Sequence, residues 1–157
     1  MQVFLIRHAD AVDPSATLRD EHRYLTPHGR DQARALGDRL RWHDCGPSQV
    51  WCSPLVRAMQ TAELALSRID TNVDVHTQPL LVPDAPAHAV VAALATLAPD
   101  AEIFLVGHEP SLSAIAALLT GGDEVGPVAK AEAIRVDDGR VRWRFAWDAE
   151  APATRSA

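Results

Sequence analysis

Hydrophobic residues in this chain gather in short unbroken runs, separated by longer stretches in which they recur every three or four positions. The runs at residues 3–6 and 103–106 are rich in β-branched and aromatic residues, as is typical of strands covered on both faces. We therefore expect both to be central parallel strands. Shorter runs at residues 50–52 and 73–75 are candidates for two further strands.

The stretches between these runs have the periodicity of amphipathic helices. Two of them open with a hydroxyl residue followed by proline, at Thr26-Pro27 and Ser53-Pro54, which predicts a side-chain N-cap with proline at the first helical position. A third helix is expected over residues 86–98. A fourth is expected after Pro110, ending at the pair Gly121-Gly122.

The alternation of strands and helices predicts an α/β fold. Residues 133–136 and 141–147 flank an Asp-Asp-Gly-Arg sequence, which predicts a hairpin with a glycine turn at a sheet edge. Only about thirty residues separate the second helix from the strand at 103–106, too few for a sizeable lid. The expected architecture is a three-layer sandwich with a mainly parallel central sheet flanked by helices, a C-terminal edge hairpin and no lid domain. We expect residues 1–150 to form a single domain and residues 151–157 a frayed C-terminal tail.

Composition and charge narrow the function. The 157 residues, 47% of them apolar, suffice for the core of one domain. The net charge is −6, and neither sign forms a long block, so nucleic acid is not an expected partner. No run approaches the roughly 20 apolar residues of a membrane span. The two cysteines, Cys45 and Cys52, form neither a disulfide framework nor a metal-binding motif, which favours a reduced cytoplasmic setting.

Histidines and arginines follow three of the predicted strands. Arg7-His8 ends the first strand, Arg57 comes one turn after Ser53-Pro54, and His108 follows the strand at 103–106. In open α/β sheets, ligands bind beyond the carboxyl ends of the parallel strands, where loops and helix N-termini converge. The four side chains are therefore expected at one rim of the sheet.

Two imidazoles and two guanidinium groups at one rim suit a phosphoryl group. Arginine pairs with phosphate oxygens through its planar fork. One imidazole could attack phosphorus while the other stabilises the equatorial oxygens, so neither a metal nor another cofactor is required. Taken singly, each residue could be a surface strand end, a solvated helix charge or a turn. Their joint placement favours a functional site.

Four segments, in order, resemble the signatures of one family. LIRHAD at residues 5–10 resembles the RHG-type signature of the histidine phosphatase, or phosphoglycerate mutase-like, superfamily, with alanine in place of glycine as in its small SixA-type phosphohistidine phosphatase branch. DEHRYLTPHG at 20–29, SPLVRAMQTA at 53–62 and VGHEP at 106–110 are similar to the DxxRxLTxxG, SPxxRAxQTA and VGHxP blocks of that branch. The resemblance spans nearly the whole chain.

This resemblance implies a role for each matched residue. His8 is the expected nucleophile, Arg7 and Arg57 the expected phosphate ligands, and His108 the expected support of the transferring group. Arg23 matches an arginine that would reach the pocket mouth and bind phosphate, although it could equally be a solvent-facing loop arginine. Thr26 and Ser53 are expected to be structural.

The general acid stays open at this point. Larger members of the family place a glutamate after the third strand, but residues 78–84 read QPLLVPD. Asp84 is a candidate acid whose rival role is to cap the helix near Pro86, and Glu109 and Asp10 lie beside expected catalytic residues. An imidazole leaving group needs less protonation than an alkoxide. A missing acid therefore favours phosphohistidine as substrate.

Three hypotheses follow for the function. The first is a phosphohistidine phosphatase acting on a phosphorelay or phosphotransfer protein, for which a shallow, open pocket is expected. The second is a small-molecule phosphatase of the same fold, acting on a sugar phosphate or nucleotide. The third is a phosphate-binding adaptor without activity, which the retention of both histidines argues against.

Overall fold

The computed structural model describes residues 1–122, 125–150 and 153–154, and its strands form one seven-stranded sheet with the order β3-β2-β4-β1-β5-β6-β7. The first four strands in this order run parallel, and the other three continue the sheet in antiparallel pairs. The strands are β1 (Gln2–Arg7), β2 (Gln49–Cys52), β3 (Val75–Thr77), β4 (Glu102–Gly107), β5 (Glu132–Asp137), β6 (Arg140–Ala146) and β7 (Ala153–Thr154).

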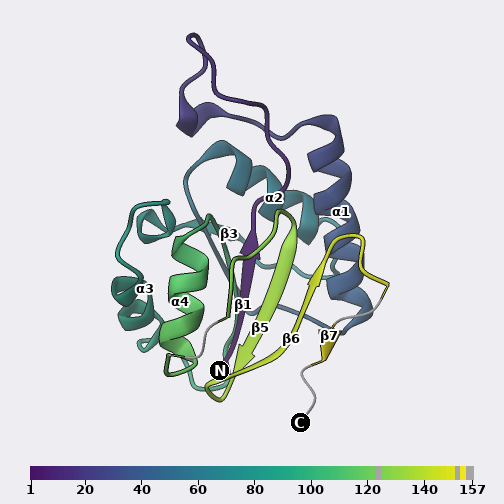
Figure 1. The fold of residues 1–157 in the computed structure, drawn as a ribbon. Helices are drawn as coiled ribbons and strands as arrows, with labels where there is room; N and C mark the ends of the chain where they lie inside the picture. The colour runs from purple at the N-terminus through teal and green to yellow at the C-terminus, as the bar shows by residue number, and fades with distance from the viewer. Residues whose placement is uncertain (123–124, 151–152, 155–157) are drawn as a thin grey trace.

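The described residues form four α-helices, which cover the sheet in two pairs, one pair on each face (Figure 1). The helical elements are η1 (Asp20–His22), α1 (Pro27–Trp42), α2 (Val56–Leu66), η2 (Pro79–Leu81), α3 (Ala87–Leu94) and α4 (Ser111–Leu119). These layers confirm the predicted α/β sandwich. None of the helices within the described ranges is long and apolar enough to cross a membrane.

Alternate residues of the central strands supply the two halves of the core. Phe4 and Phe104 face α1 and α2, whereas Leu5 and Leu105 face α3 and α4. All four are essentially inaccessible to solvent, and Leu5 pairs directly with Leu105 across β1 and β4. The unbroken apolar runs arise because both faces of these strands are covered.

The predicted N-cap of α1 and the predicted hairpin are confirmed. The Thr26 hydroxyl accepts a hydrogen bond from the amide of Gly29, with Pro27 at the first helical position. In the turn between β5 and β6, Asp138 and Gly139 both have positive φ, at 49° and 70°, as a two-residue turn matched to strand twist requires.

Three boundaries differ from the prediction. The third strand is Val75–Thr77, not residues 73–75, because pairing with β2 selects its register. Helix α2 begins at Val56 with Leu55 at the N-cap, since Ser53 still pairs with β4 through its amide. Helix α3 ends at Leu94, before a turn in which the Thr96 hydroxyl donates to a carbonyl of the last helical turn.

The C-terminal tail includes a short strand. Residues 153–154 form β7, which pairs with β6 and lies outside the hairpin in the sheet. Residues 151–152 and 155–157, part of the tail that we expected to fray, lie outside the described residues.

Candidate functional site

The carboxyl ends of the parallel strands meet beneath the connection from β1 to α1, which rises above the sheet (Figure 1). His8 directly follows β1 and His108 directly follows β4. The amide of His8 donates to the carbonyl of Gly107 at 3.1 Å, so the pairing of the two strands sets the two histidines side by side. Their ring centroids lie 5.1 Å apart, with the planes tilted by 54°.

Both histidines and Arg57 are almost completely buried. His8 is 7% exposed, His108 2% and Arg57 4%. This differs from the shallow, open pocket that we expected from the length between α2 and β4. Part of the cover over Arg57 is the η1 segment of the β1–α1 connection, which contacts it through Asp20.

The tautomer of His8 follows from its hydrogen bond. Nδ1 lies 2.8 Å from the carbonyl oxygen of Ala9, which can only accept, so Nδ1 carries the proton and Nε2 keeps its lone pair. Burial is the largest effect on His8 and lowers its pKa to about 4. The hydrogen bond to the Ala9 carbonyl raises the pKa, and the nearby positive charges of Arg57 and Arg7 lower it further. The ring is therefore neutral near pH 7, with a free nitrogen able to attack.

Thr61 fixes the main chain beside His8. Its hydroxyl accepts from the amide of Ala9 at 3.0 Å and donates to the carbonyl of Arg57 at 2.7 Å. This fully buried side chain ties the residue after His8 to the first turn of α2. The SPxxRAxQTA spacing places it one helical turn after Arg57.

The two arginines each use part of their guanidinium group within the protein. Arg7 Nη1 donates to the carbonyl of Val128 at 2.9 Å. Arg57 donates through Nη1 to the main-chain oxygen of Asp20 at 2.7 Å and through Nη2 to its carboxylate at 3.2 Å. The Nε atoms of Arg7 and Arg57 are buried without a partner among the described residues, and so is Nδ1 of His108.

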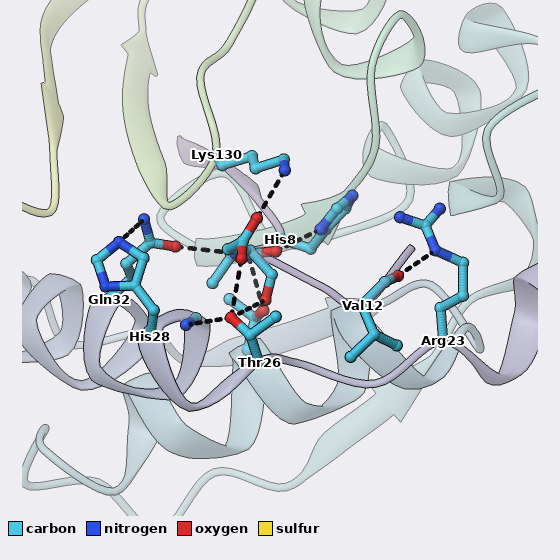
Figure 2. Close-up of polar contacts among 11 residues, drawn as sticks. His8, Val12, Arg23, Thr26, His28, Gln32 and Lys130 are labelled. Carbon is cyan, nitrogen blue, oxygen red and sulfur yellow. Dashed lines mark hydrogen bonds and ion pairs between the residues drawn. The ribbon is translucent and has the colours of Figure 1, made fainter. Parts of the chain in front are cut away.

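The carboxylate of Asp20 bridges Arg23, in the β1–α1 connection, and Arg57, in α2. Its Oδ1 accepts from Arg23 Nη1 at 2.9 Å, while its Oδ2 accepts from Arg57. Arg23 also donates through Nε to the carbonyl of Val12 at 2.7 Å (Figure 2). Arg23 thus reaches the site indirectly, through Asp20. Sequence reasoning missed Asp20, although it is the first letter of the matched DxxRxLT segment.

Lys130 adds a positive charge near His8 (Figure 2). Its Nζ lies 2.8 Å from Oδ1 of Asp10, whose Oδ2 accepts from the Thr26 hydroxyl at 2.8 Å. The next residue, Ala131, donates its amide to the main chain of Arg7 and His8. No motif in the sequence marked Lys130, because it lies in the irregular connection before β5.

The three candidate acids have different surroundings. Hydrogen bonds from Lys130 and Thr26 hold the pKa of Asp10 below its ordinary value, so Asp10 is ionised at neutral pH. The carboxylate of Glu109 accepts from the amide and hydroxyl of Ser113, at 3.1 and 2.8 Å, and so caps the start of α4.

Asp84 is exposed and makes no hydrogen bond or ion pair with any described residue. Its expected rival role as a helix cap is wrong, because α3 begins after Pro86 with no side-chain cap. Its role as an acid stays a prediction.

Two further features concern metals and thiols. Across residues 1–122 and 125–150, no three His, Cys, Asp or Glu side chains cluster in a way that could hold a metal ion. Cys45 and Cys52 are free and buried, and burial raises the pKa of both thiols. Neither is therefore a thiolate nucleophile.

Comparison with known proteins gives consistent results. Residues 3–82 match the sequence model of the histidine phosphatase superfamily (branch 1). The phosphohistidine phosphatase SixA of Escherichia coli (strain K12) is 31% identical over 125 residues, which cover 78% of this chain and 76% of that protein.

Solved structures agree with these sequence matches. A structure of the protein histidine phosphatase SixA complexed with tungstate has a TM-score of 0.86 at 27% identity, covering 94% of this chain and 97% of that chain. The alpha-ribazole phosphatase from Shigella flexneri has a TM-score of 0.72 at 24% identity, covering 87% of this chain and 90% of that chain. The second match shows a shared fold.

Proposed function

This chain belongs to the histidine phosphatase superfamily, and we propose that its His8 takes the phosphoryl group from a phosphohistidine on a partner protein and passes it to water. Phosphatase activity follows from the family and from the similarity to SixA. The choice of substrate and the role of each residue are the parts that we propose.

One observation carries the proposal. Three buried nitrogen atoms of residues close to the neutral ring of His8 have no partner in the described ranges: Nε of Arg7, Nε of Arg57 and Nδ1 of His108. A buried donor left unpaired costs about 1–3 kcal/mol, so such groups are expected where a ligand satisfies them. A phosphoryl group has three equatorial oxygens that could accept from these donors while charge spreads over them in the transition state.

The chemistry then takes two steps. Nε2 of His8 attacks phosphorus with its lone pair, and the bond from phosphorus to the leaving nitrogen breaks. The substrate imidazole, already protonated on its other ring nitrogen, leaves with the electron pair of that bond as a neutral ring. Water next attacks the phosphorus on His8, loses a proton to solvent, and releases phosphate with the imidazole restored. The hydrogen bond from Nδ1 to Ala9 would keep the ring oriented in both steps.

The surroundings of the carboxyl groups favour an imidazole leaving group. Asp10 is held ionised by Lys130 and Thr26, and Glu109 is occupied at the start of α4. Neither is suited to protonate an alkoxide as it leaves. A phosphohistidine needs little such help, because its ring nitrogen is protonated near neutral pH.

The burial of the site favours a second candidate, a small phosphorylated metabolite such as a sugar phosphate or nucleotide. Binding sites for small molecules bury most of the ligand, and His8, His108 and Arg57 are all less than a tenth exposed. For a protein substrate, the phosphorylated side chain would have to enter beside Asp20. The free, buried cysteines fit the reduced cytoplasmic setting in which we place either substrate.

The test is a comparison of kcat/KM for a phosphohistidine-bearing phosphotransfer protein, sugar phosphates, nucleotides and an aryl phosphate. His8→Ala serves as the inactive control, and a rapid-mixing reaction quenched with base should leave phosphate on the peptide that contains His8. A preference for the phosphoprotein supports the proposal, and a preference for one metabolite supports the second candidate. Phosphate on His108 in place of His8 would reverse the two roles.

A further inference from the structure

The side chain of Ser53 contacts the ring of His108 in the site. Ser53 directly follows β2, is completely buried, and its amide donates to the carbonyl of Val106 in β4 at 2.9 Å. Its Oγ lies 2.8 Å from Nε2 of His108, and the same oxygen accepts a hydrogen bond from the amide of Leu55 at 3.3 Å. Ser53 is therefore not the helix N-cap that the sequence predicted. Its hydroxyl is shared between a main-chain amide and a ring of the site.

The direction of the hydrogen bond between Ser53 and His108 follows from counting donors and acceptors. Burial keeps His108 neutral by lowering its pKa to about 3, so one of its ring nitrogens carries the proton. If Nε2 carried it, the hydroxyl hydrogen of Ser53 would have no acceptor among the described residues, and Nδ1 would be a second buried atom without a partner. If Ser53 donates to Nε2, only Nδ1–H stays unpaired. The second arrangement leaves one unsatisfied group where the first leaves two.

We propose that Ser53 is a positioning residue, whose hydroxyl donates to Nε2 of His108 and so fixes the ring proton on Nδ1, from which it is presented to the phosphoryl group. The proposal rests on the proposed function, in which that group sits at His8. Nδ1 is buried without a partner, and the rings of His108 and His8 lie with their centroids 5.1 Å apart. The tautomer of a histidine is set by the hydrogen bond that its other nitrogen makes. Ser53 thus turns His108 into a donor on the side where negative charge develops.

The test reads the tautomer directly and independently of turnover. Long-range ¹H–¹⁵N correlation spectra of the ¹⁵N-labelled protein distinguish a protonated ring nitrogen from a bare one. In the wild type we expect the proton of His108 on Nδ1, and vanadate should shift that nitrogen. In Ser53→Ala the two ring nitrogens should move toward intermediate shifts, because nothing fixes the proton. With an aryl phosphate, kcat should fall roughly tenfold to a hundredfold, at or below the effect of deleting one oxyanion donor.

Ser48→Ala is the matched control. The hydroxyl of Ser48 joins β2 to β4 at their amino ends, donating to the carbonyl of Glu102 and accepting from its amide. Its loss should lower the melting temperature and leave both the His108 tautomer and kcat unchanged. Ser53→Cys, of nearly the same size and with a weak S–H donor, gives an intermediate case if Ser53→Ala does not fold.

Two results would overturn the role of Ser53. One is a wild-type spectrum with the proton on Nε2. The other is a Ser53→Ala variant that melts earlier but keeps the tautomer and kcat, as a purely structural hydroxyl would. If the tautomer is as stated but neither the aryl phosphate nor any other phosphate is hydrolysed, the proposed function fails while the assignment of the proton stands.

Discussion

Replacing Asp20 with asparagine tests whether its carboxylate competes with a bound phosphoryl group for Arg57. The carboxylate lies 3.2 Å from Nη2 of Arg57 and 2.9 Å from Nη1 of Arg23. Asparagine keeps the shape of the side chain and the main-chain oxygen that Arg57 binds at 2.7 Å, but removes the charge. The variant should therefore bind phosphate and vanadate more tightly than the wild type.

The expected size of the effect follows from exposure. The side chain of Arg57 is 5% exposed, but that of Asp20 is 54% exposed, so solvent screens the pair. An ion pair of this kind is worth at most about 1 kcal/mol, which corresponds to roughly a fivefold lower inhibition constant for phosphate at 25 °C. Arg23 should keep its place, because it stays bound to the carbonyl of Val12.

The assay is competitive inhibition of aryl phosphate hydrolysis by phosphate and by vanadate. Glu21→Gln is the control, since it removes the same charge from the neighbouring position in η1, where Glu21 lies 3.8 Å from Arg19 in a solvent-exposed pair. An inhibition constant for Asp20→Asn that matches the control would mean that Asp20 does not compete. A raised constant would mean that Asp20 holds Arg57 in its binding position.

Three other perturbations probe the site. Because His8 must be neutral to attack and burial lowers its pKa to about 4, kcat/KM for an aryl phosphate should stay level as pH falls and drop only near that value; an acid limb near the ordinary histidine pKa, about 6.5, would contradict this. If Asp84 is the general acid, Asp84→Asn should slow alkyl phosphates severely and spare aryl phosphates and phosphohistidine, whereas equal rates with all three would remove it from the mechanism. In Gly29→Ala the new Cβ would clash with the carbonyl oxygen of Asp10, so the variant should lose about 2 kcal/mol of stability. Because Asp10 follows His8 by two residues, the variant should also lose activity per folded molecule. Gly37→Ala, whose Cβ would lie 2.3 Å from a carbonyl oxygen of α2, should lose stability alone, as thermal melts and active-site titration would show.

The sequence predicted best those strands and helices in which the order of apolar and polar residues reflects which faces of the element are buried. The central strands are unbroken apolar runs because both of their faces are covered, as the direct pairing of Leu5 with Leu105 illustrates. The cap of α1 depends on Thr26 and the amide of Gly29, three positions apart, and is therefore visible locally. The start of α2 was misplaced because the amide of Ser53 pairs with β4 and its hydroxyl bonds to His108, 55 positions away. Neither contact left a local signal.

The same distinction applies to the site. The motif residues His8, Arg57 and His108 follow predicted strands, so the rule for strand ends was enough to bring them together. Lys130 and Asp10 are 120 positions apart, and their contact depends on the path of an irregular connection. The burial of the site was missed for a similar reason. A segment of three residues, η1, covers Arg57, whereas the sequence argument considered only the length available for a lid between α2 and β4.

The unpaired donors connect the stability of the fold to its chemistry. Three buried groups without a partner, on Arg7, Arg57 and His108, oppose folding by about 1–3 kcal/mol each, comparable in sum to much of the net stability of a small domain. The fold tolerates them because strand pairing holds His8 and Gly107 together, and strand pairing depends on the core on both faces of the sheet. A site kept in this form needs no rearrangement of its donors when charge develops on a phosphoryl group. Packing in the core thus offsets the cost of the unpaired donors when the protein folds. That cost does not recur during the reaction, so these donors can stabilise the transition state, which binds them more strongly than the ground state does.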